Sequence, residues 1–256
     1  MSVRHNTVCG RPPGTVIVTG GGRGVGRATA LRLAQDGYDV IVTYYSSERE
    51  AHDVARNARD LGVQSAAIQL HLDGGDLSAW FAQIDSAIAS PLIGLVNNAV
   101  APQERKPFRA LVREDWMKAF QVNVLGCMEL IRLSAARMAR STGGFGGSIV
   151  NLSSQIARFG AADLVPYATS KGAIESSTVS LARALGPEGI RLNVVSPGPI
   201  ASDNATQLTD RETSFLEQIP LRRLCSARDV ADAIAWLISP QSDFVTGTIL
   251  PVHGGR

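Results

Sequence analysis

Tyr167 and Lys171 are the residues of this sequence best suited to acid–base chemistry. They stand four positions apart in a segment with a helical pattern, so both side chains project from one face. A free tyrosine has a pKa of about 10 and donates a proton poorly at neutral pH. Because a nearby ammonium stabilises the tyrosinate, we expect Lys171 to lower the pKa of Tyr167. The pair could then give a proton to a carbonyl oxygen or take one from an alcohol.

A tyrosine and a lysine at this spacing also occur together by chance on helix surfaces. Two features favour chemistry: the chain has only three lysines, Lys106, Lys118 and Lys171, and the neighbours of Lys171 are small. Ser154 ends a predicted strand on the side where parallel sheets bind ligands, and its hydroxyl could hold a substrate oxygen beside Tyr167. The alternative for Ser154 is a strand-end residue that satisfies local backbone groups.

A glycine-rich turn after the first predicted strand could bind phosphates. Gly20 allows a tight turn, and Gly24 and Gly26 leave room for phosphates near backbone N–H groups and for helix–sheet packing. The following helix N-terminus adds partial positive charge. Placement in a strand–helix–strand unit favours nucleotide binding over a simple turn. The expected cofactor contacts here are Gly20, Gly22, Arg23, Gly24, Val25 and Gly26.

The end of the second predicted strand favours NADP(H) over NAD(H). An acid that could bind a ribose 2′-hydroxyl is missing there, and the first carboxylate is Glu48. Arg23 could instead pair with a 2′-phosphate, to which two serines could donate hydrogen bonds. The alternative is a solvated Arg23 and serines that cap the next helix. Further cofactor contacts are expected from Tyr44, Ser46, Ser47 and Asp73, although Asp73 fits a helix or turn cap equally well.

Alternating strand and helix patterns must position these groups. Apolar runs without clean alternation predict strands buried on both faces, at 15–19, 40–43, 66–70, 92–96, 148–152, 192–195 and 248–252. Helical patterns lie between them, at 24–36, 48–61, 77–89, 113–139, 165–185 and 228–238. This repetition predicts an α/β fold, a single-domain Rossmann-type doubly wound parallel sheet with helices on both faces.

The length of 256 residues allows one large domain. We expect a loose N-terminal leader over 1–13 and a dinucleotide-binding and catalytic domain over 14–256. Residues 199–222 lack strong periodicity, so they predict a lid segment over the site.

Composition argues against several partner classes. The net charge of +2, from 25 basic and 23 acidic residues, is too weak to indicate a nucleic-acid or membrane surface. Apolar runs stay short of the roughly 20 residues of a membrane span. The three cysteines, Cys9, Cys127 and Cys225, are far apart and indicate neither a metal site nor a disulfide framework. A reducing cytoplasm fits, and the N-terminus lacks the apolar segment of a secretory signal.

Taken together, these motifs resemble the short-chain dehydrogenase/reductase family over about residues 14–255. The family's TGxxxGxG loop matches Thr19, Gly20, Gly24 and Gly26, and its catalytic set matches Ser154, Tyr167 and Lys171. Its structural asparagine matches Asn123, and its Pro-Gly turn matches Pro197 and Gly198. The pattern is most similar to that of bacterial 3-oxoacyl-carrier-protein reductases.

The resemblance implies a division of roles. Tyr167 is the acid/base, Ser154 orients the carbonyl, and Lys171 lowers the tyrosine pKa and binds the nicotinamide ribose. Asn123 supports a water-linked proton path to Lys171. The implied reaction passes a hydride between nicotinamide and a small carbonyl or alcohol substrate, in a homotetramer or homodimer. Further residues implied to contact the cofactor are Asn98, Ala99, Pro197, Gly198, Ile200 and Ser202.

Three positions depart from the family pattern. Val100 replaces the glycine of the family's NNAG motif, and valine cannot adopt a positive φ cheaply, so this loop is expected to differ near the cofactor. Ser202 replaces a threonine but keeps a hydroxyl. His253 replaces an acid near the C-terminus, where we expect a structural or interface histidine and no catalytic role.

Other functions stay open. A sugar or polyol dehydrogenase would use the same scaffold, and the expected substrate contacts do not separate it from an oxoacyl reductase: Gln155, Arg158, Phe159, Leu164 and the 199–222 segment. A non-catalytic NADP(H)-sensing protein should lack Tyr167 or Lys171, and this chain keeps both. Enoyl reductases of related fold space the tyrosine and lysine further apart.

Overall fold

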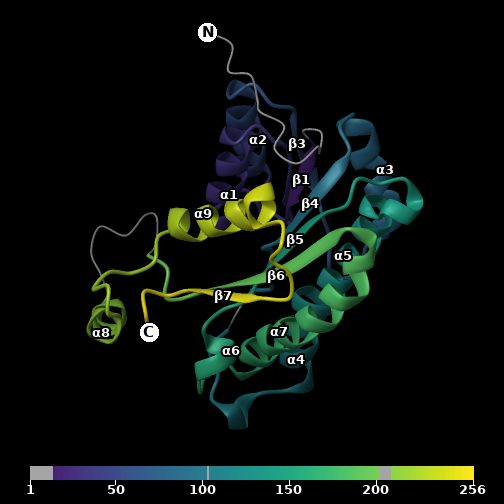
Figure 1. Ribbon diagram of the computed structural model, residues 1–256. Helices are drawn as coiled ribbons and strands as arrows, with labels where there is room; N and C mark the ends of the chain where they lie inside the picture. Colours follow the sequence, from purple (N-terminus) through teal and green to yellow (C-terminus); the bar gives the residue numbers. More distant parts are fainter. Residues whose placement is uncertain (1–13, 103, 202–208) are drawn as a thin grey trace.

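A seven-stranded parallel sheet forms the centre of the computed structural model, which describes residues 14–102, 104–201 and 209–256 (Figure 1). The strand order is β3-β2-β1-β4-β5-β6-β7. The strands are β1 (Thr15–Val18), β2 (Asp39–Tyr44), β3 (Ser65–Gln69), β4 (Leu92–Asn97), β5 (Gly147–Leu152), β6 (Ile190–Pro197) and β7 (Ile249–Val252). The order reverses between β1 and β4, which places a ligand crevice at their carboxyl ends.

Helices cover both faces of this sheet (Figure 1). One face carries α1 (Gly24–Gln35), α2 (Glu48–Asp60) and α9 (Ala227–Ile238). The other carries α3 (Leu77–Ala87), α4 (Arg113–Phe120), α5 (Cys127–Met138) and α7 (Val165–Leu185). Two shorter helices, α6 (Ile156–Phe159) and α8 (Asp210–Gln218), follow β5 and β6.

Alternate strand residues build two apolar cores. In β1, Ile17 packs toward α3, α5 and α7, whereas Val16 and Val18 pack toward α1, α2 and α9. All three are fully buried, as are Ile41 and Val42 of β2. Strands that are apolar on both sides can only lie inside such a sandwich, so the predicted doubly wound α/β fold is confirmed.

Element boundaries differ from prediction by a few residues, and three segments differ in kind. The helical pattern of 113–139 is divided by a π-helical turn, η3 (Gln121–Gly126), between α4 and α5. The short helix α6 was not predicted, and neither was α8, which lies within the expected lid of 199–222. Such short helices, of four and nine residues, carry too few periodic positions to be recognised from pattern alone.

Two parts of the predicted domain organisation lie outside the described residues: the N-terminal leader of 1–13 and the 202–208 part of the lid segment. No helix among the described residues has the length and apolar character that crossing a membrane requires. That part of the chain also contains no cluster of three or more metal-ligating side chains.

Candidate active site

Thr19 joins the glycine turn to the loop that follows β4. Its buried hydroxyl accepts hydrogen bonds from the N–H groups of Asn98 and Ala99, both at 2.9 Å, and lies 3.3 Å from the Val96 carbonyl. The Asn98 amide donates back to the carbonyls of Thr19 at 2.8 Å and Gly20 at 3.2 Å. These bonds hold the ends of β1 and β4 in one rigid unit at the crevice.

The glycine turn has the form that a phosphate cradle needs. Gly20 and Gly24 adopt left-handed φ values of 62° and 51°, and a Cβ on Gly24 would meet nothing within 4 Å. A Cβ on Gly26 would lie 2.3 Å from the Gly20 carbonyl oxygen, so α1 can pack this closely only through glycine. The turn therefore leaves open space in front of the α1 N-terminus, where a pyrophosphate fits.

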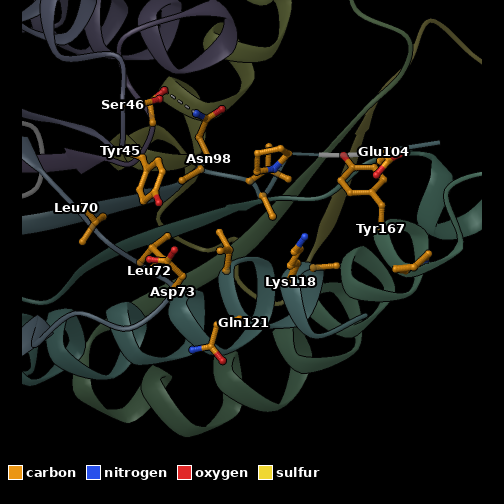
Figure 2. Close-up of a pocket in the computed structure, with 18 of the residues that line it drawn as sticks. Tyr45, Ser46, Leu70, Leu72, Asp73, Asn98, Glu104, Lys118, Gln121 and Tyr167 are labelled. Atoms are coloured by element: carbon orange, nitrogen blue, oxygen red, sulfur yellow. Dashed lines mark hydrogen bonds between the residues drawn. The ribbon is translucent and has the colours of Figure 1, made fainter. Parts of the chain in front are cut away.

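A cavity of about 1160 Å³ runs from this turn to Tyr167 (Figure 2). Its wall contains residues from the ends of several strands and from α4. A dinucleotide therefore fits the residues present. The predicted site residues that line it are Gly20, Gly22, Arg23, Val25, Tyr44, Ser46, Ser47, Asp73, Asn98, Ala99 and Tyr167.

The end of the cavity near β2 offers groups that are not engaged elsewhere. Arg23 is exposed and makes no ion pair with any described residue. Ser47 precedes α2, but its hydroxyl makes no capping hydrogen bond to that helix. The alternative in which this serine serves as a side-chain cap is therefore wrong. Tyr45, which sequence reasoning missed, also lines this end.

Tyr167 and Ser154 meet at the other end. The Ser154 hydroxyl lies near the phenol and acts to lower the pKa of Tyr167, but burial is the larger effect and raises that pKa above its ordinary value. The expectation that Lys171 lowers this pKa differs from what the structure shows, because no effect of Lys171 on the phenol is found. The phenol is thus held in its protonated form.

Lys171 is buried against the end of β5. Its ammonium lies 5.7 Å from the centre of the Tyr167 ring and donates a 2.6 Å hydrogen bond to the Leu152 carbonyl. Burial lowers the pKa of Lys171 to about 8, because removal from water disfavours the charged form. Tyr167 and Lys171 share a helix face as predicted. The hydrogen bond of the Lys171 ammonium, however, goes to strand β5 and not to the phenol.

Asn123 lies in the π-helical turn and links three segments. Its side chain accepts the N–H of Ala101 and donates to the Ser170 hydroxyl, both at 2.9 Å. Ser170 in turn donates to the Tyr167 carbonyl at 2.8 Å. Asn123 therefore anchors the first turns of α7, which carry Tyr167 and Lys171.

A small internal cavity lies behind Lys171 and Asn123, with room for about one water-sized sphere. Asn97 and Asn151 also line it, and Asn97 Nδ2 donates to Asn151 Oδ1 at 2.9 Å. Their remaining polar atoms, Asn97 Oδ1 and Asn151 Nδ2, are buried without a partner among the described residues. These two atoms are suited to hold a water.

The predicted nicotinamide-side residues lie apart from the large cavity. A Cβ on Gly198 would meet the His253 Cβ at 2.9 Å and the Gln155 Oε1 at 3.6 Å. Gln155 Oε1 and His253 Nδ1 are buried without partners in the described part of the chain. Pro197 ends β6, Ile200 forms an isolated bridge with Cys225, and Ser202 lies outside the described residues.

The structure also places the loop residue Val100 and several of the expected substrate contacts. Val100 lines the cavity without a left-handed backbone, because Arg222 is the only non-glycine residue with positive φ among those described. Leu164 lines the cavity as well. Arg158 instead stacks over Phe159, with the guanidinium 5.7 Å from the ring centre.

Sequence reasoning missed the contribution of α4 and its π-helical turn to the cavity wall. Lys118 and Val122 line it, one helical turn apart, as does Glu104 in the loop before α4. The sequence did carry a signal for this wall. Lys118 and Val122 are four residues apart in a predicted helix that also carries Asn123, so they were expected to share a helix face.

Comparison with known proteins agrees with this architecture. A family model described as enoyl-(acyl carrier protein) reductase matches residues 20–256, nearly the whole chain. The chain belongs to the short-chain dehydrogenase/reductase family. Within this family, the uncharacterized oxidoreductase YgfF of Escherichia coli (strain K12) is 38% identical over 247 residues, which cover 94% of this chain and 98% of that protein. The 3-oxoacyl-[acyl-carrier-protein] reductase FabG of Staphylococcus aureus (strain N315) is 34% identical over 243 residues, covering 94% and 97%.

Solved structures of short-chain dehydrogenases/reductases share the fold. Acetoin dehydrogenase YohF from Salmonella typhimurium superposes with a TM-score of 0.84 at 30% identity, over 95% of this chain and 97% of that one. The angucycline C-6 ketoreductase LanV with bound NADP gives a TM-score of 0.86 at 27% identity, over 94% and 95%. The family resemblance and the single-domain Rossmann-type fold are confirmed, and the chain is an oxidoreductase of this family.

Proposed function

We propose that this protein is an NADP(H)-dependent reductase of 3-oxoacyl-type or related ketones, with Tyr167 as proton donor. The observation that carries the proposal is the position of Tyr167, with Ser154 near its phenol, at one end of a cavity whose other end is the glycine turn. That arrangement holds a proton donor and a dinucleotide cradle in one continuous space.

The proposed mechanism uses each side chain for a separate task. Ser154 and Tyr167 hydrogen-bond to the substrate carbonyl oxygen, and Tyr167 transfers its proton to that oxygen as the carbonyl is reduced. The raised pKa of Tyr167 keeps the phenol protonated at neutral pH, which is the form a donor needs. When bound, the nicotinamide supplies the hydride that reaches the carbonyl carbon.

Proton resupply is proposed to run through Lys171. Its pKa of about 8 allows the group to lose and regain a proton near neutrality. The internal cavity behind Lys171 and Asn123 provides two unpartnered polar atoms, Asn97 Oδ1 and Asn151 Nδ2, for a water that could pass a proton to the amine. The contact of Lys171 with the nicotinamide ribose belongs to this proposal as well.

Preference for NADP(H) is supported by the groups near β2. Arg23, Ser46 and Ser47 line the cavity and have unengaged polar atoms. A ribose 2′-phosphate would accept hydrogen bonds from all three side chains, whereas a 2′-hydroxyl would bond to at most one or two of them. The structure of the related LanV carries NADP, which is consistent with this proposal.

A ketone substrate is favoured over the alternatives. The matching family model is described as an enoyl reductase, but the four-residue spacing of Tyr167 and Lys171 resembles that of carbonyl reductases. A sugar or polyol dehydrogenase remains the second candidate. A non-catalytic NADP(H)-sensing protein is disfavoured, because the tyrosine, the serine and the lysine are all kept at the site.

Assembly as a homotetramer or homodimer is part of the proposal. The exposed apolar side chains of Leu125 and Val179, on η3 and α7, suit contact with a second copy. Location in the cytoplasm stays a prediction.

The test is a screen at 340 nm, where reduced nicotinamides absorb. NADPH and NADH are compared against β-ketoesters, diketones and sugars, with polyols in the reverse direction. Turnover of ketones with NADPH is the expected result. Turnover of polyols alone would favour the second candidate, and binding of NADPH without any turnover would favour a sensing role.

A further inference from the structure

Lys118 is a cation in the wall of the large cavity that the proposed mechanism does not use. Figure 2 shows it rising from α4 with its nitrogen pointing into the cavity, whereas Gln121 points away. Lys118 makes no ion pair within the described residues. The other two lysines are engaged: Lys106 by two carboxylates and Lys171 by the Leu152 carbonyl.

The nearby acids do not neutralise Lys118. Asp115 and Glu104 line the same cavity, but both are held by Lys106, at 2.8 Å and 3.2 Å. The hydrogen bond from Lys106 is the main cause of the lowered pKa of Asp115, and Lys118 contributes only the weakest effect. Asp73, on another part of the wall, lies 4.0 Å from His71. The Lys118 ammonium thus keeps its charge available to a ligand.

The wall around Lys118 is otherwise largely apolar. Side chains of Val100, Leu111, Met117, Leu164 and Pro166 line the same cavity as Lys118 and Tyr167. Lys118 is exposed, so water screens its charge in part, and the apolar side chains that share the cavity wall reduce this screening for an anion bound inside. The combination suits a ligand with an apolar body and a terminal anionic group.

We propose that Lys118 recognises an anionic group of the substrate, so that the ketones reduced at Tyr167 are oxo acids or other anionic ketones. This inference rests on the proposed ketone-reductase function. The apolar residues of the same cavity wall would contact the carbon chain of the substrate. Lys118 would bind the anionic end of the substrate and so orient its ketone toward Tyr167.

The experiment compares 3-oxobutanoate, 4-oxopentanoate and 5-oxohexanoate with their methyl esters, for the unmodified protein and for Lys118→Met. We expect Lys118→Met to lower the acid-to-ester ratio of kcat/KM about fivefold to tenfold, since one partly screened ion pair is lost. Lys118→Arg should restore most of the ratio.

Arg109→Gln is the matched control, because Arg109 is an exposed cation outside the cavity. The acid-to-ester ratio of this variant should equal that of the unmodified protein. A ketone that carries a phosphonate in place of the carboxylate distinguishes a carboxylate substrate from a phosphorylated one.

Binding of 5-oxohexanoate to the NADP⁺-saturated protein, measured by calorimetry, gives a readout independent of turnover. Weaker binding to Lys118→Met, with its unfolding temperature unchanged, supports the inference. An unchanged acid-to-ester ratio and unchanged binding would overturn it while leaving the reductase function intact. A loss of NADPH affinity as the sole effect would also overturn it, because Lys118 would then bind the cofactor. If no ketone is turned over by the unmodified protein, the proposed function fails, and calorimetry alone decides the role of Lys118.

Discussion

Lys171 lies with its ammonium 5.7 Å from the ring centre of Tyr167 and gives its 2.6 Å hydrogen bond to the strand β5 instead. Burial moves the two pKa values in opposite directions: that of Tyr167 rises and that of Lys171 falls to about 8. The lysine therefore loses its proton before the tyrosine does as pH increases. Any stabilisation of the tyrosinate by Lys171 requires the ammonium form, which dominates only below that pH.

Replacing Tyr167 by phenylalanine removes the proposed proton donor and leaves the ring in place. We expect kcat for ketone reduction to fall by about 10²-fold to 10⁴-fold, the usual contribution of general acid catalysis. Absorbance at 340 nm measures the rate. Tyr38→Phe is the control, since Tyr38 is outside the cavity, and it should retain full activity. Equal turnover by the two variants would remove Tyr167 from the mechanism.

The buried Lys171 makes stability depend on pH. Its pKa is about 8 in the folded protein and 10.5 when unperturbed, so between these values the unfolded chain binds more protons. The Lys171 contribution to the free energy of unfolding therefore rises with pH across this window, by up to about 3 kcal/mol. Below pH 8 the contribution is a constant penalty.

Urea unfolding of Lys171→Met beside the unmodified protein isolates this contribution. We expect the stability of the variant relative to the unmodified protein to decrease by up to about 3 kcal/mol between pH 7.5 and pH 10.5. The raised pKa values of Cys127 and Cys225 act in the opposite direction in both proteins, and burial, which the substitution leaves in place, is the main cause of each. A difference that does not vary with pH would show that Lys171 is not desolvated.

Arg23→Gln tests the cofactor preference. Loss of a charged hydrogen bond to a 2′-phosphate should raise KM for NADPH about tenfold and change KM for NADH little. Arg27→Gln serves as the matched control, because Arg27 is an exposed arginine of α1 that does not line the cavity. A preference of the unmodified protein for NADH would defeat the assignment of Arg23.

Gly26→Ala tests the packing of α1 on the glycine turn. The new Cβ would lie 2.3 Å from the Gly20 carbonyl oxygen and 2.6 Å from the Asn98 amide nitrogen, so the turn must shift. We expect a loss of about 1–3 kcal/mol in the free energy of unfolding and weaker NADPH binding. Gly172→Ala, in helix α7 with nothing within 4 Å of its Cβ position, should be neutral or stabilising by up to about 1 kcal/mol. Similar losses from both variants would argue against a specific clash at Gly26.

The sequence by itself determined the fold and the parts of the site that depend on local spacing. Apolar strands such as Thr15–Val18 can only be buried on both faces, and residues four apart in a helix, such as Tyr167 and Lys171, must share a face. The glycine turn could be placed for the same reason, since its position between a strand and a helix is local information.

Only the tertiary structure decided how these groups are engaged. The hydrogen bond of Lys171 to Leu152 and the opposite pKa shifts arise from burial between α7 and β5, which no local pattern encodes. The same holds for Lys118, which lines the cavity and stays unpaired among the described residues because Lys106 holds the neighbouring acids. Desolvation and long-range contacts depend on segments brought together by folding, so residue type and spacing alone could not fix them.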